Sequence, residues 1–253
     1  MDLVGPRYIK NDGSFYSLNV IDLFSREVYI EAQRTKADDH VCQGLLRCWK
    51  TMGLPDYLQM DNALNFRGSN RHPRSMGQVI RLCLNYGVHP VFIPIREPWR
   101  NGVVERFNET YDKRFFRRQW FSSYALLKKQ SKNFQRFHNR NHRYSCLKGK
   151  TPYEARTADR FTPVTAAPNK MPDLSFAPDG CLSLIRFIRS DRQLDIFGER
   201  FEVSKDLVYC YVRAQIVINL HAIQLYRGDE IVDTFEYRMP DNLLPEDSLN
   251  DVG

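Results

Sequence analysis

The sequence has no long apolar run, and no stretch approaches the roughly 18 consecutive apolar residues of a membrane-spanning helix. Its first residues contain neither the basic segment nor the apolar segment of a secretory leader, so no signal peptide is predicted. The six cysteines are scattered without a C-x-x-C pair, which argues against a disulfide framework and against a zinc site built on paired cysteines. Together these absences predict a cytoplasmic protein with reduced thiols.

The composition has no extreme that would place the chain outside the globular class. Of its 253 residues, 42% are hydrophobic and 26% are charged, which is ordinary for a globular protein. The length suits one large domain or two smaller ones, each with a buried core. Lys and Arg number 37 against 30 Asp and Glu, a net charge of +7. This balance suggests a polyanionic partner but does not identify one.

Residues 1–158 alternate between segments typical of strands and segments typical of helices. Short turn signals such as Asn11-Asp12-Gly13 separate β-rich runs and predict three antiparallel strands within residues 1–34. Further strands are predicted at 57–60 and 88–93. Apolar residues at helical spacing predict helices over 38–52, 76–86, 101–120 and 123–141. This order predicts a mixed five-stranded α/β sheet with flanking helices and right-handed crossovers.

The remainder of the chain has a different pattern. Four prolines within 159–178 predict a linker. Short strands separated by turn signals are predicted at 182–188, 194–196, 200–203, 207–213, 216–220, 222–227 and 231–237. They suggest a small all-β barrel over residues 179–238. The last residues, 239–253, carry four acids and no base and are predicted to be disordered.

Three carboxylates stand in informative positions. Asp2 begins the first predicted strand, Asp61 follows the short apolar run 57–60, and Glu105 lies near the start of a predicted helix. Two aspartates at strand ends and one glutamate on a helix can converge to hold two divalent ions, an arrangement that breaks and joins phosphodiesters. Spacing alone leaves a plain alternative open, because any three of 30 acids can be singled out.

The local contexts of these acids resemble the catalytic core of DDE transposases and retroviral-type integrases, above all the transposases of bacterial insertion sequences. The resemblance covers about residues 1–158. It rests on Asp2, Ile21-Asp22-Leu23-Phe24-Ser25-Arg26, Met60-Asp61-Asn62, Asn101-Gly102-Val103-Val104-Glu105-Arg106-Phe107-Asn108, and Tyr144 through Thr151-Pro152-Tyr153-Glu154. The string from Asn101 to Asn108 is its most specific part. The segment 181–237 resembles, more loosely, a small barrel that follows this core in some of these transposases.

The resemblance implies a ribonuclease-H-like fold, two Mg²⁺ or Mn²⁺ ions, and catalytic and metal-binding roles for Asp2, Asp61 and Glu105. It implies DNA as the partner, namely transposon ends and target DNA, and a homo-oligomer that pairs two ends. Water would free a 3′-hydroxyl, which would then attack a target phosphodiester. No covalent protein intermediate is required.

The sequence also departs from the family pattern. Ala63 stands where a glycine is usual, only Met1 precedes Asp2, and the chain has no room for an upstream helix-turn-helix region. Three alternatives stay open, the first of them because of these departures. The first is a catalytically impaired DNA-binding fragment, the second a structure-selective metal-dependent nuclease, and the third an interaction module that binds an acidic protein.

A basic stretch follows Glu105 directly. Residues 106–143 hold eleven Lys or Arg and only two acids, Glu109 and Asp112. Neutralisation of phosphates there would give salt-sensitive DNA binding that is independent of sequence. The other interpretation is an ordinary solvated helix face. The residues predicted to contact DNA are Arg100, Arg106, Lys113, Arg114, Arg117 and Arg118.

Other polar residues near these motifs have lesser predicted roles. Asn62 and Asn101 are predicted to support the acids, by positioning a water or, for Asn101, by capping the helix. Asp22 is predicted to cap a turn and Glu109 to be a surface or supporting acid. A zinc site at His138, His142 and Cys146, which are spaced four residues apart, is considered and not favoured because no fourth ligand is apparent.

Overall fold

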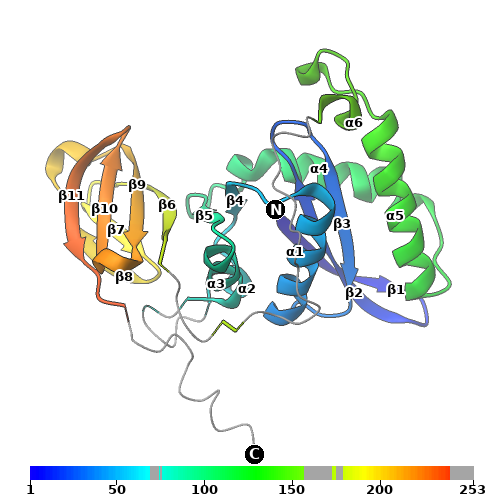
Figure 1. Cartoon of the computed structure of the whole chain (residues 1–253), viewed down its shortest axis with the longest axis horizontal. Helices are drawn as coiled ribbons and strands as arrows, with labels where there is room; N and C mark the ends of the chain where they lie inside the picture. Colours follow the sequence, from blue (N-terminus) through cyan, green and yellow to red (C-terminus); the bar gives the residue numbers. More distant parts are fainter. Residues whose placement is uncertain (69–73, 75, 157–172, 175–178, 240–253) are drawn as a thin grey trace, which may run out of the picture. The chain divides into compact units, whose positions relative to one another are not determined.

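A computed structural model describes residues 1–68, 74, 76–156, 173–174 and 179–239. The chain divides into two compact units: unit 1, Met1–Pro55 with Asn101–Ala167, and unit 2, Asp56–Arg100 with Pro168–Gly253. Each unit contains helices and its own sheet (Figure 1). The predicted linker, apart from 173–174, and the predicted tail from residue 240 lie outside the described residues. The domain boundary predicted at residue 158 also lies outside them and stays a prediction.

Unit 1 is built on three antiparallel strands in chain order, β1 (Asp2–Ile9), β2 (Gly13–Ile21) and β3 (Val28–Gln33). The β1–β2 turn places Asn11 at φ 66° and Gly13 at φ 77°, conformations that Asn and Gly adopt readily. In the β2–β3 turn, Asp22 Oδ2 accepts hydrogen bonds from the Ser25 amide at 2.6 Å and the Ser25 hydroxyl at 2.5 Å. The three predicted strands and the predicted turn cap at Asp22 are therefore confirmed.

The helices of unit 1 are α1 (Asp38–Met52), α4 (Gly102–Arg114), α5 (Tyr124–Asn141) and α6 (Pro152–Ala155), with short 3₁₀ turns η2 (Phe116–Arg118) and η3 (Ser145–Leu147). The α1 prediction is confirmed, and α5 begins after Ser123, whose hydroxyl caps it by accepting from the Leu126 amide. The single helix predicted over 101–120 is wrong, because the backbone leaves the helix at Phe115. Within the described ranges, no helix has the length and apolar character needed to cross a membrane.

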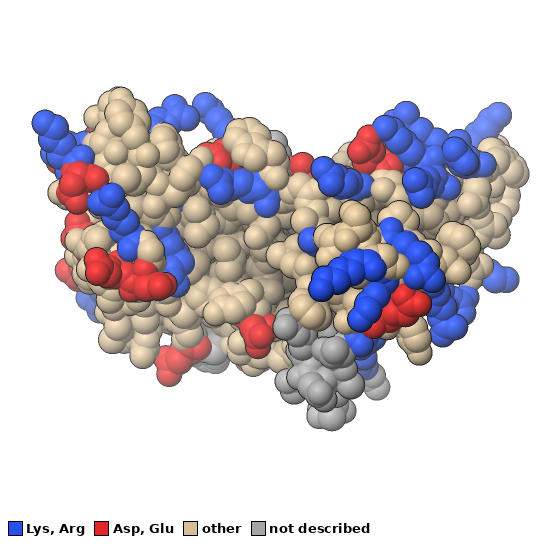
Figure 2. Space-filling view, turned by 90° about the horizontal axis from the view of Figure 1, so that it is seen from above, with Lys and Arg blue, Asp and Glu red and all other residues tan. Residues whose placement is uncertain are grey.

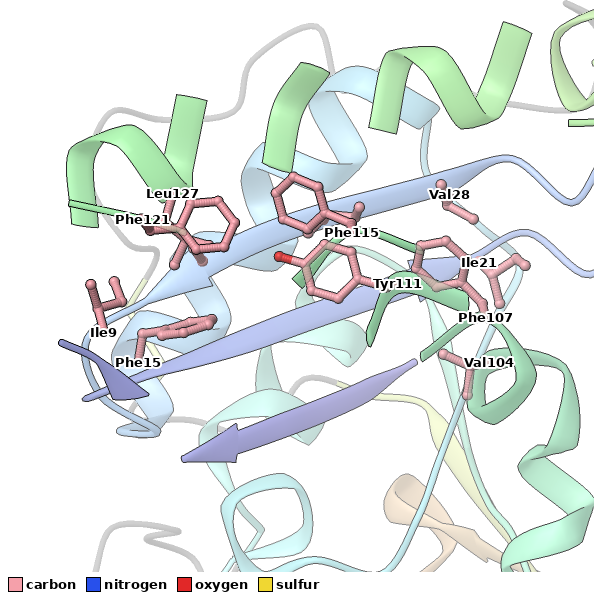
Figure 3. Close-up of a cluster of buried hydrophobic side chains, with 12 residues drawn as sticks. Ile9, Phe15, Ile21, Val28, Val104, Phe107, Tyr111, Phe115, Phe121 and Leu127 are labelled. Carbon is pink, nitrogen blue, oxygen red and sulfur yellow. The ribbon is translucent and has the colours of Figure 1, made fainter. Parts of the chain in front are cut away.

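The break after α4 has a packing cause. Phe115 and Phe121 are both buried, and their ring centroids lie 5.4 Å apart. In one continuous helix, residues six apart point to different faces, so the two rings would not meet. They belong to the apolar core of unit 1, where α4 and α5 cover one face of the sheet (Figure 3). Its members are Ile9, Phe15, Ile21, Val28, Ile30, Ala32, Val104, Phe107, Tyr111, Phe115, Phe121 and Leu127.

β3 is an edge strand, and side chains of α5 satisfy its free backbone groups. Asn139 accepts from the Val28 amide at 3.0 Å and donates to the Val28 carbonyl at 2.9 Å. Gln135 accepts from the Ile30 amide at 2.9 Å, and Lys132 Nζ donates to the Ile30 carbonyl at 2.5 Å. An uncovered edge would offer these groups to another chain, so α5 takes the place of a fourth strand.

Unit 2 contains a mixed sheet of six strands in the order β11-β10-β9-β6-β5-β4. The strands are β4 (Tyr57–Met60), β5 (His89–Phe92), β6 (Cys181–Phe187), β9 (Tyr211–Val217), β10 (Ala222–Arg227) and β11 (Glu230–Glu236). β4, β5 and β6 run parallel, and the remaining pairs are antiparallel. Two short helices, α2 (Leu64–Arg67) and α3 (Gln78–Asn85), lie between β4 and β5 in the chain.

A separate hairpin completes unit 2. β7 (Gln193–Ile196) pairs with β8 (Glu199–Glu202) through Phe197 and Gly198, which have φ of 52° and 97°. Positive φ at both central residues is typical of a tight two-residue hairpin, so the turn predicted at this position is confirmed. Three 3₁₀ segments, η1 (Pro98–Asn101), η5 (Lys205–Leu207) and η6 (Ile218–Leu220), account for the remaining regular structure of the described residues.

Two sheet predictions differ from the structure. The five strands predicted for one sheet are divided, since β1, β2 and β3 form one sheet whereas β4 and β5 continue into β6. The predicted barrel is not confirmed: among the described residues its strands form an open sheet and a hairpin, because β6 pairs with β5 on one side and β11 remains an edge. The strands predicted at 207–213 and 216–220 are one strand, β9, flanked by η5 and η6.

Candidate active site

Asp2 lies at the start of β1 and is held by a side chain from α4. Asn108 Nδ2 donates a hydrogen bond to Asp2 Oδ2 at 2.5 Å. The Asn108 carbonyl oxygen in turn accepts from Asn19 Nδ2 at 2.7 Å, and Asn19 is the residue of β2 that faces Asp2 across the ladder. The amide of Asn108 therefore fixes one carboxylate oxygen of Asp2 from the helix side.

This support continues into the core of unit 1. Ser17 Oγ donates to Asn19 Oδ1 at 2.8 Å, and Ser17 lies close enough to Tyr111 to affect the pKa of its hydroxyl. The Tyr111 hydroxyl pairs with Ser131 Oγ on α5 at 2.8 Å. Burial raises the pKa of Tyr111, so the hydroxyl stays protonated and available as a donor. We name the hydrogen-bonded chain Ser17–Asn19–Asn108–Asp2 the Asp2 relay.

The members of the Asp2 relay are deeply buried except at its outer end. Ser17 and Asn19 have no exposed surface, and the neighbouring Tyr111 and Ser131 are each 1% exposed. Asn108 and Asp2 are half-buried. Buried polar groups without partners are costly, so a chain in which each member has one keeps this orientation fixed.

Glu105 lies in the first turn of α4, where a negative charge is favoured by the helix dipole. Residues three apart on a helix share a face, so Glu105 and Asn108 are neighbours on α4. Because Asn108 bonds to Asp2, unit 1 brings two of the three predicted carboxylates to the same side of α4. Glu105 is half-buried, as Asp2 is.

Asn101 supports the start of β1. It is 6% exposed, and its Nδ2 donates to the Met1 carbonyl at 3.2 Å. The predicted helix-capping role of Asn101 is wrong, since its side chain makes no cap bond to α4. Met1 is itself 5% exposed, so the residue before Asp2 is packed and bonded even though it begins the chain.

Asp61 follows β4 in unit 2 and is held locally. Its Oδ1 accepts from the Ala63 amide at 3.1 Å, which closes a tight turn. Ala63 has φ −62° and precedes α2, so this backbone needs no glycine where the family pattern usually has one. The Ala63 departure therefore places no strain on the turn.

Asn62 joins the ends of β4 and β5. Its Nδ2 donates to the Ile93 carbonyl at 2.7 Å, and its Oδ1 accepts from Arg186 Nη2 at 3.1 Å. Arg186 is 4% exposed and also donates to the Asp195 carbonyl at 2.8 Å. Burial lowers the pKa of Arg186 to about 10, because a buried guanidinium loses its hydration. The predicted supporting role of Asn62 thus has a structural basis in the strand ends that it joins.

Sequence reasoning missed Asn108, Asn19, Ser17 and Arg186 as supports. Asn108 had a signal, because it lies three residues after Glu105 within the most specific string. Arg186 also had one, since it is the only charge in the apolar run 182–188. Ser17 and Asn19 had none, because a strand with alternating residues gives no indication of a hydrogen-bond partner on a distant helix.

The donor set suits a hard divalent cation. Asp2, Asp61 and Glu105 offer carboxylate oxygens, which Mg²⁺ prefers, and Asn108 occupies only Oδ2 of Asp2. Asp2 and Glu105 belong to unit 1 and Asp61 belongs to unit 2, so their convergence stays a prediction. In the part of the chain that the structure describes, no group of three or more His, Cys, Asp or Glu side chains forms a metal-binding cluster.

The zinc alternative has no support in the geometry. The rings of His138 and His142 stack at 4.6 Å, and His138 Nε2 lies 2.9 Å from the Tyr144 hydroxyl. His138 also packs edge-on against Phe107 at 5.2 Å. Burial lowers the pKa of His138 to about 3, so it is a neutral packing residue. Cys146 lies on η3 with an exposed side chain.

The six residues predicted to contact DNA differ in how their charges are used. Five of them lie exposed on α4 and η2: Arg106, Lys113, Arg114, Arg117 and Arg118. Lys113 pairs with Glu109, which confirms Glu109 as a surface acid. Arg117 pairs with Asp112 at 2.5 Å, and Asp112 also pairs with Arg7. For Arg106, Arg114 and Arg118, no carboxylate partner is found among the described residues.

Arg100 is the sixth of these residues and lies in unit 2. Its guanidinium lies over the ring of Tyr211 at 4.1 Å and pairs with Glu97 at 2.7 Å. The Tyr211 hydroxyl donates to both oxygens of Glu97 at 2.9 Å. The charge of Arg100 is therefore already engaged locally.

Comparison with known proteins finds a match to one segment of this chain, which we name the integrase core segment after the family model. Residues 86–152 match the family model described as "Integrase core domain". This segment contains Glu105 and Asn108, and it confirms the resemblance to an integrase or transposase core over that stretch. It does not include Asp2 or Asp61. The comparison with curated proteins found no match to the chain.

Two solved structures are similar in outline. The catalytic core domain of HTLV-2 integrase, solved in complex with magnesium in a trimeric form, is 16% identical, with 62% of this chain and 93% of that chain covered and a TM-score of 0.46. The intasome of simian T-cell lymphotropic virus, solved with the PP2A regulatory subunit B56 gamma, is 15% identical, with 94% and 75% covered and a TM-score of 0.49.

Proposed function

We propose that this chain is a DNA transposase or integrase that cuts DNA 3′ ends and joins them to a target. The observation that carries the proposal is the Asp2 relay: α4, within the integrase core segment, presents Glu105 and uses Asn108 to hold Asp2. An amide fixed on one oxygen of a carboxylate is the type of support that metal-ligating carboxylates have. The proposed ribonuclease-H-like arrangement adds Asp61 of unit 2 as the third ligand.

Asp2, Asp61 and Glu105 would hold two Mg²⁺ or Mn²⁺ ions, which when bound activate the attacking hydroxyl and stabilise the leaving oxygen. The protein's own residues orient the reacting groups. Asn108 keeps Oδ2 of Asp2 turned toward α4 and leaves Oδ1 for the ion. The Ala63 amide holds Oδ1 of Asp61 in the same way. Because these carboxylates are already oriented, less conformational entropy is lost when the reacting groups reach the transition state.

The proposed reaction needs no energy source, because its first step is a hydrolysis and its second step exchanges one phosphodiester for another. In the first step a water oxygen forms a bond to phosphorus and the 3′ oxygen leaves with a proton. In the second step that 3′-hydroxyl attacks a target phosphodiester, and the target 3′ oxygen leaves. Each step breaks one P–O bond and forms one, so no side-chain nucleophile is needed. Exposed Arg106, Arg114 and Arg118 would contact DNA phosphates beside Glu105.

The test is a joining assay with labelled 3′-recessed duplexes and a plasmid target in Mg²⁺ and in Mn²⁺. Glu105→Gln keeps the size of the side chain and removes its charge. Metal-dependent joined products that disappear in Glu105→Gln would support the proposal. Cleavage without joining would favour a structure-selective nuclease. DNA binding with neither product in either metal would refute activity of this chain and favour an impaired DNA-binding fragment.

A further inference from the structure

Unit 1 has a groove along the edge of its sheet. Side chains of α1 and α5 form its walls, and the β3 residues Tyr29, Glu31, Ala32 and Gln33 form its floor. Its volume is about 970 Å³. Figure 1 shows α1 and α5 on either side of β3. We name it the β3 groove. Six cations line it, namely Arg34, Arg47, Lys50, Lys128, Lys132 and Arg136, with Glu31 as the one acid among the lining residues.

The acid at the floor does not balance these charges. The Glu31 side chain is 4% exposed, and its oxygens lie 3.3 Å from Arg47, 3.5 Å from Lys132 and 3.9 Å from Lys128. One carboxylate thus serves three cations. Burial lowers the pKa of Lys132 even with Glu31 beside it, so the charged form is only partly compensated.

Two of the other three cations of the groove increase the surplus of positive charge. Arg34 pairs with Asp12 at 2.5 Å, outside the lining residues. Lys50 and Arg136 have no carboxylate partner among the described residues. In Figure 2, Lys and Arg are abundant on the visible surface of the described chain, with acids between them. This surplus of positive charge on both walls of the groove favours an anionic ligand.

The spacing of the cations fits a linear polyanion. Lys128, Lys132 and Arg136 follow one another at intervals of four residues, so they lie on one face of α5. Successive members are about 6 Å apart along the helix at about 1.5 Å per residue. Two nucleotide steps of one DNA strand advance by about 6.8 Å along the duplex axis. Arg47 and Lys50 face them from α1.

The aromatic rings of the groove are already covered. Lys132 Nζ lies 3.7 Å from the centroid of Tyr29, and Arg34 lies 4.1 Å from that of Tyr124. Bases that bind by stacking need such ring faces to be open. The groove therefore offers charge for phosphates and no open platform for bases.

We propose that the β3 groove binds the phosphodiester backbone of one nucleic-acid strand without reading its bases. The proposal rests on the proposed function only in naming DNA as the polyanion. It adds a second DNA-binding surface to the residues of α4 and η2, formed by cations from α1, β3 and α5.

The test measures the salt dependence of DNA binding in EDTA, so that no catalysis contributes. The full chain is titrated into a fluorescein-labelled strand of about 20 nucleotides, and separately into its duplex, at several KCl concentrations. The variant is Lys50→Gln with Arg136→Gln, whose side chains support no buried group. The matched control is Lys148→Gln with Lys150→Gln, two exposed residues of unit 1 outside the groove lining.

If both groove cations contact phosphates, the slope of log K against log salt falls by about 1.4 for the single strand and about 1.8 for the duplex. The control keeps the slope of the unaltered chain. Unchanged slopes in the groove variant would overturn the proposal. Loss of self-association or of polyglutamate binding, with unchanged slopes, would also overturn it and assign the groove to a second copy or to an acidic protein.

A second variant tests the sign of the effect. Glu31→Gln keeps the volume and releases three cations from their shared partner. DNA binding then becomes tighter and its salt slope steeper, whereas a purely structural role of Glu31 predicts weaker binding or none. Circular dichroism confirms that each variant is folded. If the groove variant has a reduced slope and the joining assay shows no activity, the groove proposal stands and only the proposed function is refuted.

Discussion

Replacing Asn108 tests the support of Asp2 most directly. Asn108→Ala removes the hydrogen bond to Asp2 Oδ2, and it leaves the buried Nδ2 of Asn19 without its acceptor. A hydrogen bond to a charged group contributes about 1.5–3 kcal/mol. Asp2 is half-buried, so solvent competes and the lower end of this range applies. About 1.5 kcal/mol corresponds to roughly a tenfold loss of Mn²⁺ affinity and of joining rate.

The assay is Mn²⁺ titration of the folded chain, followed by the joining reaction at saturating metal. Thr110→Ala is the control, because Thr110 lies on the same helix and, among the residues that the structure describes, its hydroxyl bonds only to the Arg106 carbonyl. Urea unfolding is measured for both variants, since the orphaned Asn19 amide costs about 1–3 kcal/mol of folding free energy. Metal affinity within twofold of the unaltered chain, in a folded Asn108→Ala protein, would refute the positioning role.

Asn108→Asp separates positioning from packing by its pH dependence. It places a second carboxylate at hydrogen-bond distance from Asp2, where two negative charges repel, so the pair holds one proton more tightly. The apparent pKa of the pair is then raised above the usual value of about 3.9. Below that raised pKa the pair is protonated and binds metal poorly, and binding returns as pH increases. The acid limb of the pH–rate profile therefore moves to higher pH, whereas a merely structural change would lower the rate at every pH.

Two further predictions concern stability. Arg186→Leu leaves the Asp195 carbonyl and Asn62 Oδ1 without their buried donor, so the free energy of unfolding falls by about 3 kcal/mol in urea. Arg189→Leu, exposed and two residues from the end of β6, is the control, and equal midpoints would contradict the role. His138 has a folded pKa of about 3, below its unfolded value of about 6.5, so the unfolded chain binds the extra proton and stability is lost as pH falls from 6.5 toward 3. His138→Phe lowers the pH slope of unfolding free energy in this window by up to about 1.4 kcal/mol per pH unit, and an unchanged slope would place the titration elsewhere.

The sequence predicted local elements well because their determinants are local. α1 and β4 have the predicted bounds, and the turns at Asp22 and at Phe197-Gly198 form as their residues require. The end of α4 was not predictable from periodicity, because it depends on where Phe115 and Phe121 meet in the core. The sheet partners were not predictable either, since β6 joins β5 from about 90 residues away in the chain.

The same distinction between local and tertiary determinants applies to the candidate site. Asp2, Asp61 and Glu105 were predicted by motif, because the reacting groups of a protein family follow fixed patterns in the chain. Their supports are ordinary polar residues whose importance depends on tertiary neighbours. Nothing in the alternating pattern of β2 marks Asn19 as the link between its neighbour Asp2 and a helix that begins more than 80 residues later. The correction at Asn101 has the same origin, since a capping position and a tertiary bond to Met1 have identical sequence signals.

On the proposed function, the metal site needs ligands from both units, because Asp2 and Glu105 belong to unit 1 and Asp61 to unit 2. Within each unit, local hydrogen bonds hold a predicted ligand carboxylate. In unit 1 the support comes from Asn108 on α4, a helix whose Phe107 and Tyr111 are packed in the core. In unit 2 the Ala63 amide holds Asp61, and Arg186 holds the adjacent Asn62. Damage to either support should therefore weaken metal binding without abolishing the fold of the other unit. That independence distinguishes two prepared half-sites from a site that forms only when metal binds.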